Sequence, residues 1–249
     1  MEQMKWNKRF IYPKSSRSLV MGQRHYEIGN DKLPSVTTIL SQTQSEEKRK
    51  SLADWQSRMG QQNADRIRDI SALRGTAMHT YLEGYINNTP HLDLTSVGKE
   101  AGRMANIIVQ SGLRDLGEVW GSEVTLYYPG LYAGQTDVVG VYDGQPAIID
   151  FKQTNRPKRR EWINDYFEQL GAYCMAHNHV YGTRIQSGII LMCSKDFLFQ
   201  RFEVSGKEFV KHQHNFLKKV DQFYQQKPRE TQNVPDGEDH QNTKNDQKV

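Results

Sequence analysis

The stretch GLYAGQTDVVGVYDGQPAIIDFKQT, residues 130–154, decides the fold. Its Asp143-Gly144 pair is typical of a two-residue hairpin turn, because a type I′ turn needs a positive φ at both central positions. The flanking segments 131–142 and 145–152 are predicted to be the two paired strands, since they alternate or run apolar between turn residues. We therefore expect a tight antiparallel hairpin at the centre of the fold.

This hairpin would bring two carboxylates together. In the register that the turn sets, Asp137 lies directly opposite Asp150, with Cβ atoms ~4.5–5.5 Å apart. Two charges that close repel by about 3 kcal/mol, and their valine and isoleucine neighbours offer little relief from solvent. A divalent cation would turn the repulsion into binding, and carboxylate oxygens suit Mg²⁺ or Mn²⁺, as one ion or two. A three- or five-residue loop would instead send Asp137 to the other face.

A lysine follows the second carboxylate. Lys152 lies two residues after Asp150, so both side chains point to the same face of the strand. An ammonium group there can orient an attacking water molecule or offset charge on a phosphate. The alternative is an ordinary surface ion pair, which fits less well because the aspartate belongs to the apolar run IIDF.

Two further side chains could reach the same place. His79, in RGTAMH, is expected on a helix, where it leans back over Gly75 and has room to face another element or a metal. The alternative is an ordinary core or surface histidine. Glu123, in SEVTL, could point toward the site or equally to solvent, so we leave it out of the predicted site.

The segment of about 159–179 is predicted to be a helix with two stripes. One stripe is apolar and is expected to cover the sheet, and it consists of Ile163, Phe167, Leu170 and Cys174. The adjacent stripe consists of Trp162, Tyr166, Gln169 and Tyr173. Gln169 and Tyr173 could contact Lys152, a phosphate or a base, and the alternative is a wide amphipathic face with two polar tips. Trp162 and Tyr166 could stack on bases.

The remaining segments indicate the fold class. Residues 1–30 are expected to form short strands or an extended arm, and the run that follows Pro34 and Ser35 is expected to open a helix. Residues 45–72 have a helical period, with Leu52, Trp55, Met59, Ile67 and Ile70 as the expected inward positions. More helices are predicted at 74–86, 97–112 and 206–226, and more strands at 118–128, 185–193 and 197–204.

This order of elements predicts an α/β or mixed α+β protein with a central mixed sheet of about five strands flanked by helices. The three-strand run allows an antiparallel meander. The segment 145–152, the following helix and 185–193 could form a right-handed βαβ crossover. We expect an N-terminal arm and helical region at 1–70, a core domain at 71–226 and a disordered polar tail at 227–249.

Composition narrows the function classes. The chain has 33 Lys and Arg against 29 Asp and Glu, a net charge of +4, which is compatible with a nucleic-acid partner. Four cations follow the hairpin and could each neutralise a phosphate, although such runs are often merely solvated: Arg156, Lys158, Arg159 and Arg160. The basic N-terminal arm could act in the same way.

Other chemistry is not encoded. The chain has no GxxxxGK[ST] motif, so ATP use is not expected, and no run of ~20 apolar residues for a membrane span. Its two cysteines, Cys174 and Cys193, cannot build a zinc ribbon or a four-cysteine iron–sulfur cluster, and they suggest a reducing compartment. We expect a cytoplasmic protein, since no secretory signal opens the chain and a mitochondrial transit peptide fits poorly.

Four motifs together carry a family likeness. GQTD, IDFK and QLGAY, preceded by RGTAMH, resemble the PD-(D/E)xK nucleases of the RecB type over roughly residues 70–205. The N-terminal RHYEIGNDKLPSVTTILS looks like the start of the branch that holds the mitochondrial genome maintenance exonucleases and their phage relatives. Thr136 stands where the family name has Pro, and the iron–sulfur cluster of several RecB-type relatives is missing.

The resemblance implies roles for individual residues. His79, Asp137, Asp150 and the main-chain carbonyl of Phe151 would hold the metal, and Lys152 would be the catalytic lysine. Gln169 and Tyr173 would support Lys152 and the DNA. Arg74, Thr154 and the four cations of 156–160 are further candidates for DNA-binding or supporting residues. The fold would be a restriction-endonuclease-like core with a helical N-terminal part.

We therefore expect a metal-dependent exonuclease that acts on single-stranded DNA ends, in replication, recombination or repair. The likeness implies that the strand passes through an arch or channel that admits one strand. The alternatives are an endonuclease of the same fold that cuts internally or at branches, and a catalytically silent DNA-binding protein.

Overall fold

A mixed five-stranded sheet forms the centre of the protein, of which the computed structural model describes residues 4–226. The strand order is β4-β5-β6-β7-β8, and only β6 and β7 run parallel. The strands are β4 Leu116–Tyr128, β5 Tyr132–Tyr142, β6 Gln145–Thr154, β7 Ser187–Ser194 and β8 Phe199–Ser205. The predicted fold class, the meander and the parallel connection of 145–152 to the strand after the helix are confirmed. The tail predicted at 227–249 lies outside the described residues.

The central hairpin has the predicted register. Asp143 and Gly144 have φ values of 49° and 75°, as a type I′ turn requires. The pairs run from Tyr142↔Gln145 to Val138↔Ile149 without a shift. The next position in this register puts Asp137 and Asp150 across from each other.

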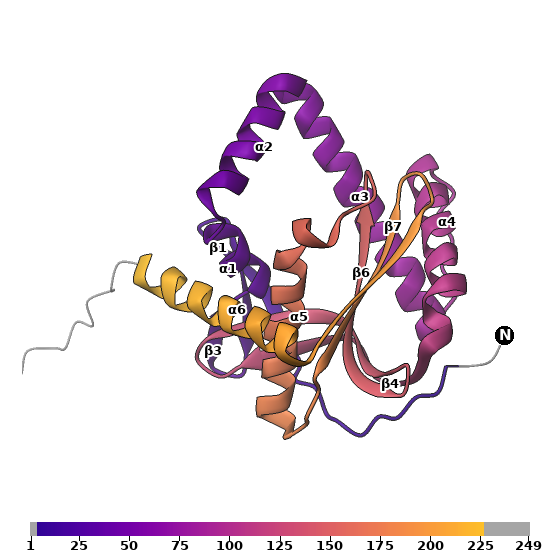
Figure 1. Cartoon of the computed structure of the whole chain (residues 1–249). Helices are drawn as coiled ribbons and strands as arrows, with labels where there is room; N and C mark the ends of the chain where they lie inside the picture. Colours follow the sequence, from indigo (N-terminus) through magenta and orange to yellow (C-terminus); the bar gives the residue numbers. More distant parts are fainter. Residues whose placement is uncertain (1–3, 227–249) are drawn as a thin grey trace, which may run out of the picture.

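Alternate residues of the hairpin face two different helical layers (Figure 1). Val139 and Ile148 belong to the core beneath α5 Asn164–Tyr181 and α6 Gly206–Gln226. Val138 and Ile149 belong to the core beneath α3 Gln61–Ile86 and α4 Ser96–Ser111. Because strand side chains alternate, Asp137 and Asp150 share the face that α5 covers.

Helix α5 begins later than predicted. Residues 160–162 form one 3-10 turn, and Trp162 is 56% exposed and precedes the helix. The backbone of Lys158 is held by the side chain of Gln200, through N–H and C=O bonds of 2.8 Å each, so this segment cannot take helical hydrogen bonds. The predicted apolar stripe from Ile163 to Cys174 is buried, as expected.

The N-terminal region forms a second, smaller sheet of β1 Ser16–Val20, β2 Gln23–Ile28 and β3 Asp31–Pro34. Tyr26 and Leu33 of this sheet pack on Ala133 of β5. Ser35 then caps α1 Val36–Gln42 by accepting a hydrogen bond from the Thr38 N–H, which confirms the predicted helix start. Residues 10–13 form no strand, so this part of the segment is an extended arm, as one of the two alternatives expected for residues 1–30.

Helix α2 Glu46–Met59 contradicts one prediction. None of its residues is buried, and Leu52 and Met59, expected to face inward, are 50% and 39% exposed. Helices α2 and α3 meet at Gly60, whose φ is 75°, and rise from the body as an inverted V (Figure 1). The helical period shows which side of a helix is apolar, but not whether a partner covers it. Helix α3 also runs unbroken across the expected domain boundary at residue 70.

Candidate active site

A pocket of about 180 Å³ opens at one end of the main sheet. Its walls come from the N-terminal sheet, α3, the meander β4–β6 and α5. Six residues that the sequence singled out line it: His79, Asp137, Asp150, Lys152, Gln169 and Tyr173. Tertiary structure therefore gathers side chains that are up to 94 residues apart in the chain, from His79 to Tyr173.

The two aspartates lie at the floor of this pocket. Both are buried, and each has a different partner. Asp137 Oδ2 accepts a hydrogen bond of 2.6 Å from the Phe151 N–H, whereas Asp150 Oδ2 contacts the Lys152 ammonium. Strand β6 thus supplies a partner for each of the two carboxylates.

Burial separates the pKa values of this pair. Desolvation raises the pKa of Asp150 to about 6, although the Lys152 charge opposes the shift. Burial alone would also raise the pKa of Asp137, but His79 and Lys152 lower it below its ordinary value, with help from the Phe151 N–H. For Lys152 itself, burial is outweighed by Asp150 and Asp137, so its pKa is raised and the ammonium keeps its charge.

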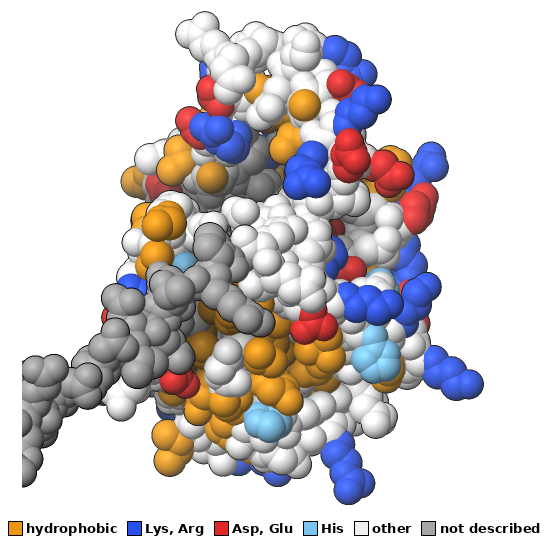
Figure 2. Space-filling view, turned by 90° about the vertical axis from the view of Figure 1, so that its left-hand side faces the viewer, with side chains coloured by type: hydrophobic (Ala, Val, Ile, Leu, Met, Phe, Trp, Pro, Cys, Tyr) orange, Lys and Arg blue, Asp and Glu red, His pale blue; other side chains and the backbone are white. Residues whose placement is uncertain are grey.

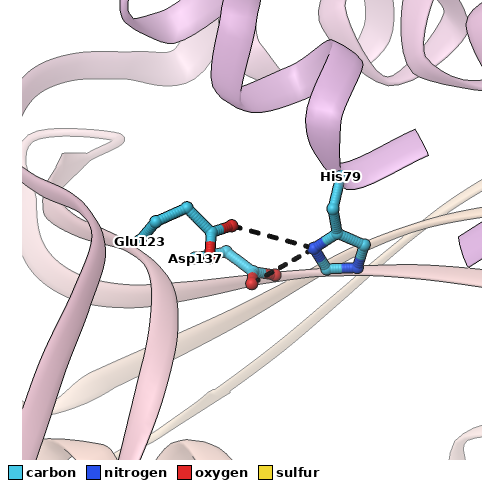
Figure 3. Close-up of side chains that lie close together, drawn as sticks. All are labelled: His79, Glu123 and Asp137. Carbon is cyan, nitrogen blue, oxygen red and sulfur yellow. Dashed lines mark ion pairs between the residues drawn. The ribbon is translucent and has the colours of Figure 1, made fainter. Parts of the chain in front are cut away.

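A third acid lies beside His79 and Asp137 (Figure 3). His79 Nδ1 is 3.3 Å from Asp137 Oδ1 and 4.0 Å from Glu123 Oε1. Each of the three residues offers one ligand atom, and these atoms lie within 4.8 Å of one another. Gln135 fixes the glutamate by donating from Nε2 to its Oε2 at 2.6 Å.

Charge makes this group a fit for a divalent cation. Burial would lower the pKa of His79, but the Asp137 carboxylate outweighs it and raises the pKa to about 9. Burial, together with the charge of Asp137, raises the pKa of Glu123 to about 8. At neutral pH, protons therefore balance the negative charge, and a cation would replace them. The carboxylate oxygens of this group suit Mg²⁺ or Mn²⁺.

Glu123 is absent from the predicted site because the register that places it there depends on a loop of unspecified length. The loop between β4 and β5 joins Tyr128 to its partner Tyr132, and the pairs Ser122↔Val138 and Val124↔Thr136 continue that register. Glu123 therefore stands across from Asp137, with an unusual φ of 52°. The Pro129-Gly130-Leu131 segment does not specify a loop length as Asp143-Gly144 does, so this register could not be read from the sequence.

Helix α5 completes the pocket wall. Gln169 Nε2 donates to the Tyr173 hydroxyl at 3.2 Å, and both side chains are buried. The Tyr173 ring lies so close to Gly134 that a Cβ there would be 2.7 Å from a ring carbon. One turn before Gln169, the Tyr166 ring centre is 5.1 Å from Lys152 Nζ. Helix α5 therefore contacts Lys152 through Tyr166 and lines the pocket through Gln169 and Tyr173.

Arg74 supports the site from behind. It is buried, and its guanidinium donates to Gln153 at 2.9 Å, to Glu100 at 3.2 Å and to Asn155. These bonds join α3 and α4 to the end of β6. Arg74 therefore has a supporting position, and a direct contact with DNA does not fit its burial.

Two smaller expectations are also resolved. Thr154 is buried and donates to the Arg156 carbonyl at 2.8 Å, so it fixes the turn that follows β6. The space at Gly75 faces Gln153, whose Cγ would be 3.5 Å from a Cβ there, and not the His79 ring. His79 faces the pocket, as expected.

The basic run 156–160 does not line the pocket. Arg160 is held by both oxygens of Glu208 at 2.9 Å, and Arg159 lies 5.2 Å from the Trp162 ring centre. A grip on phosphates by this run stays a prediction.

The described site has the features of a PD-(D/E)xK nuclease core. These are a hairpin with two facing aspartates, a lysine two residues after the second aspartate, a helix histidine and a Gln-x-x-x-Tyr helix. No family model matches the chain. The chain is 30% identical over 179 residues to mitochondrial genome maintenance exonuclease 1 of Xenopus tropicalis, and 31% identical over 175 residues to that of Mus musculus. These matches cover 68% and 66% of the chain, and 50% of the length of each relative. The chain belongs to the PD-(D/E)xK nuclease superfamily, in the RecB-type branch of these exonucleases.

A solved structure is also similar. A candidate exonuclease from Eubacterium rectale superposes with a TM-score of 0.47 at 14% identity, covering 63% of this chain and 65% of that one.

Proposed function

We propose that the chain is a metal-dependent exonuclease that hydrolyses phosphodiester bonds at the ends of single-stranded DNA. The observation that carries the proposal is the common face of Asp137, Asp150 and Lys152 in one pocket with His79. The curated relatives are named as exonucleases, and the chain spans about half of their length, so activity and substrate are proposed here for this chain.

The residues of the pocket suggest a division of roles. His79, Asp137, Asp150 and the Phe151 carbonyl would hold Mg²⁺ or Mn²⁺, with Glu123 beside them. When bound, the cation would make water more acidic and withdraw charge from the phosphate. Lys152 keeps its proton, so it acts as a fixed positive charge and not as a base. Its ammonium, fixed against Asp150, would orient the attacking water and stabilise the charge that develops on the phosphate.

The inverted V of α2 and α3 supports the preference for single strands. Three apolar side chains of the V, Leu52, Met59 and Leu73, are 50%, 39% and 63% exposed. Figure 2 shows basic, acidic and hydrophobic side chains interspersed over this upper part of the molecule. Unpaired bases offer apolar faces that such side chains can contact, whereas a duplex hides them. We propose that one strand passes beneath this V to the pocket.

The compartment stays a prediction. No helix within residues 4–226 is long and apolar enough to cross a membrane. The relatives are named mitochondrial genome maintenance exonuclease 1. For this chain, the cytoplasmic location stays a prediction from the sequence.

End-labelled linear and closed circular single strands test the proposal. We expect the linear strand to be degraded with Mg²⁺ or Mn²⁺ and to survive with a chelator, whereas the circle persists throughout. Cutting of the circle would favour the endonuclease alternative. Binding of both strands without any cleavage would favour the silent DNA-binding alternative.

A further inference from the structure

The N-terminal sheet turns one of its faces toward the catalytic pocket. Arg17 pairs with Tyr26, and Arg24 lies two residues before Tyr26, so all three side chains share one face. Tyr26 packs on Ala133 of β5 and fixes the sheet to the core. Arg17, Arg24 and Tyr26 all line the pocket.

Both guanidinium groups are free to take a ligand. Within the described part of the chain, neither makes a side-chain hydrogen bond or an ion pair, and both residues are exposed. Arg17 lies 5.6 Å from the Tyr26 ring centre, a contact that orients the guanidinium without using its N–H donors. The exposed residue Thr37 also lines the pocket.

Because the pocket floor is acidic, a polyanion such as DNA needs positive charge on another wall of the pocket. When a metal has displaced the protons of the site, the carboxylates of Asp137, Asp150 and Glu123 would repel a DNA strand that approaches them. A bound cation and Lys152 offset this repulsion only at the phosphate that is cut. A neighbouring phosphate needs a cation of its own, and planar guanidinium groups bind phosphate oxygens in pairs.

We infer that Arg17 and Arg24 form a phosphate subsite, which holds an internal phosphodiester of the strand next to the one being cut. The inference rests on the proposed function and adds to it the side of the pocket on which the uncut part of the strand lies. It also gives the N-terminal sheet a role in substrate binding, separate from the metal and from Lys152.

Salt dependence of binding tests the subsite. The probe is a fluorescent oligothymidylate with hydroxyl groups at both ends, so that every phosphate is internal, and binding is measured with a chelator present. For Arg17→Gln and for Arg24→Gln we expect the slope of log K against log salt to fall by about 0.7 each, and for the double variant by about 1.4. With Mg²⁺ added, we expect kcat/KM to fall at least about tenfold in the double variant, because the strand is no longer positioned.

Matched controls separate this effect from others. Lys32→Gln removes an exposed cation of the same sheet that is 3.6 Å from Glu27 and does not line the pocket, so binding and its slope should not change. Calorimetric binding of Mn²⁺ and the unfolding midpoint should equal those of the wild type in both arginine variants. Arg17→Lys with Arg24→Lys should keep the slope.

The two proposals fail in different ways. If the wild type cuts the strand and the double variant keeps both its slope and its kcat/KM, the subsite is refuted and the nuclease proposal stands. Loss of Mn²⁺ binding in the double variant would also overturn the subsite, since the arginines would then act through the metal site. If the wild type neither binds nor cuts single strands, the proposed function itself fails.

Discussion

Lys152 is confined by its neighbours, with Asp150 at its ammonium group and the Tyr166 ring along one side. We expect Lys152→Ala to lower the cleavage rate by at least about 10²-fold, because a fixed positive charge at the reacting phosphate is lost. Affinity for a single strand should stay within a few fold. Single-turnover cleavage and fluorescence anisotropy measure the two quantities.

The control for this variant is Lys218→Ala, which removes an exposed cation of α6 outside the pocket. Its cleavage rate should equal that of the wild type within a few fold. An unchanged rate in Lys152→Ala would contradict the catalytic assignment.

Two glycines of the site differ in what an added methyl group would meet. At Gly134, a Cβ would be 2.7 Å from the Tyr173 ring, so Gly134→Ala should displace the ring and destabilise the fold by about 1–3 kcal/mol. At Gly75, within α3, the nearest atom is 3.5 Å away, so Gly75→Ala should be neutral or should stabilise by up to about 1 kcal/mol. Urea unfolding measures both. Equal changes in the free energy of unfolding for the two variants would show that the Tyr173 ring can move aside at little cost.

At the scale of the element, α5 holds the N-terminal segment through His177. Thr183 Oγ1 donates to Asn178 at 2.7 Å, so it accepts the His177 Nδ1–H at 2.8 Å. His177 Nε2 is then the acceptor for the Tyr12 hydroxyl at 3.2 Å. Burial, with Arg9 nearby, lowers the pKa of His177 to about 4.

This shift predicts how stability depends on pH. The unfolded histidine binds a proton near pH 6.5, whereas the folded one stays neutral down to about pH 4. The contribution of His177 is therefore complete above pH 6.5 and is lost as the pH falls to about 4, by about 3 kcal/mol in all. His177→Gln lacks this titration, so its unfolding free energy should fall less between pH 7 and pH 4. Parallel pH profiles of the two proteins would rule the prediction out.

Helix α2 makes a separate prediction, because it lies outside the core. Leu52 and Met59 are half-exposed, so the double variant Leu52→Ser with Met59→Ser should keep the unfolding midpoint of the wild type. If a strand passes beneath the V, affinity for single-stranded DNA should fall by about 3- to 10-fold, or about 0.7–1.4 kcal/mol. This is at the low end of the ~1–3 kcal/mol of an aromatic stack. Titrations of a labelled oligonucleotide measure it.

The matched control is a double variant in the loop before α4, Leu92→Ser with Leu94→Ser. These two leucines are 76% and 68% exposed. Their loss should leave the affinity unchanged. If both double variants weaken binding equally, the effect is one of general surface polarity and the passage beneath the V is not supported.

The whole molecule is built as two cores on opposite faces of one sheet. Cys174 of α5 lies in one core and Cys193 of β7 in the other, and both thiols are free. Burial raises the pKa of Cys174 to about 12 and that of Cys193 to about 11. Thiolate, the reactive form, is therefore scarce in the folded protein.

Thiol labelling accordingly reports unfolding of each core. We expect both cysteines to react only as fast as the molecule opens, and to react together if the two cores unfold as one unit. Full reactivity in urea is the reference. Rapid labelling of one thiol in the native protein would show that its core opens by itself.

The sequence determined the centre of the fold. Asp143 and Gly144 fixed the hairpin register through turn geometry alone, and that register places Asp137, Asp150 and Lys152 on one face. Helix starts with a capping residue, such as Ser35, were also readable. These features are local, because the residues that determine a turn or a helix start lie within that turn or helix start.

Tertiary structure alone decided the rest. Glu123 reaches His79 only because a loop of unspecified length sets the β4–β5 register, and Arg74 is buried because β6 and α4 close over it. The exposure of α2 and the position of Arg17 and Arg24 likewise depend on contacts between distant segments. An amphipathic or basic pattern shows which side of an element is apolar or charged. Which other element or ligand contacts that side depends on how the rest of the chain packs.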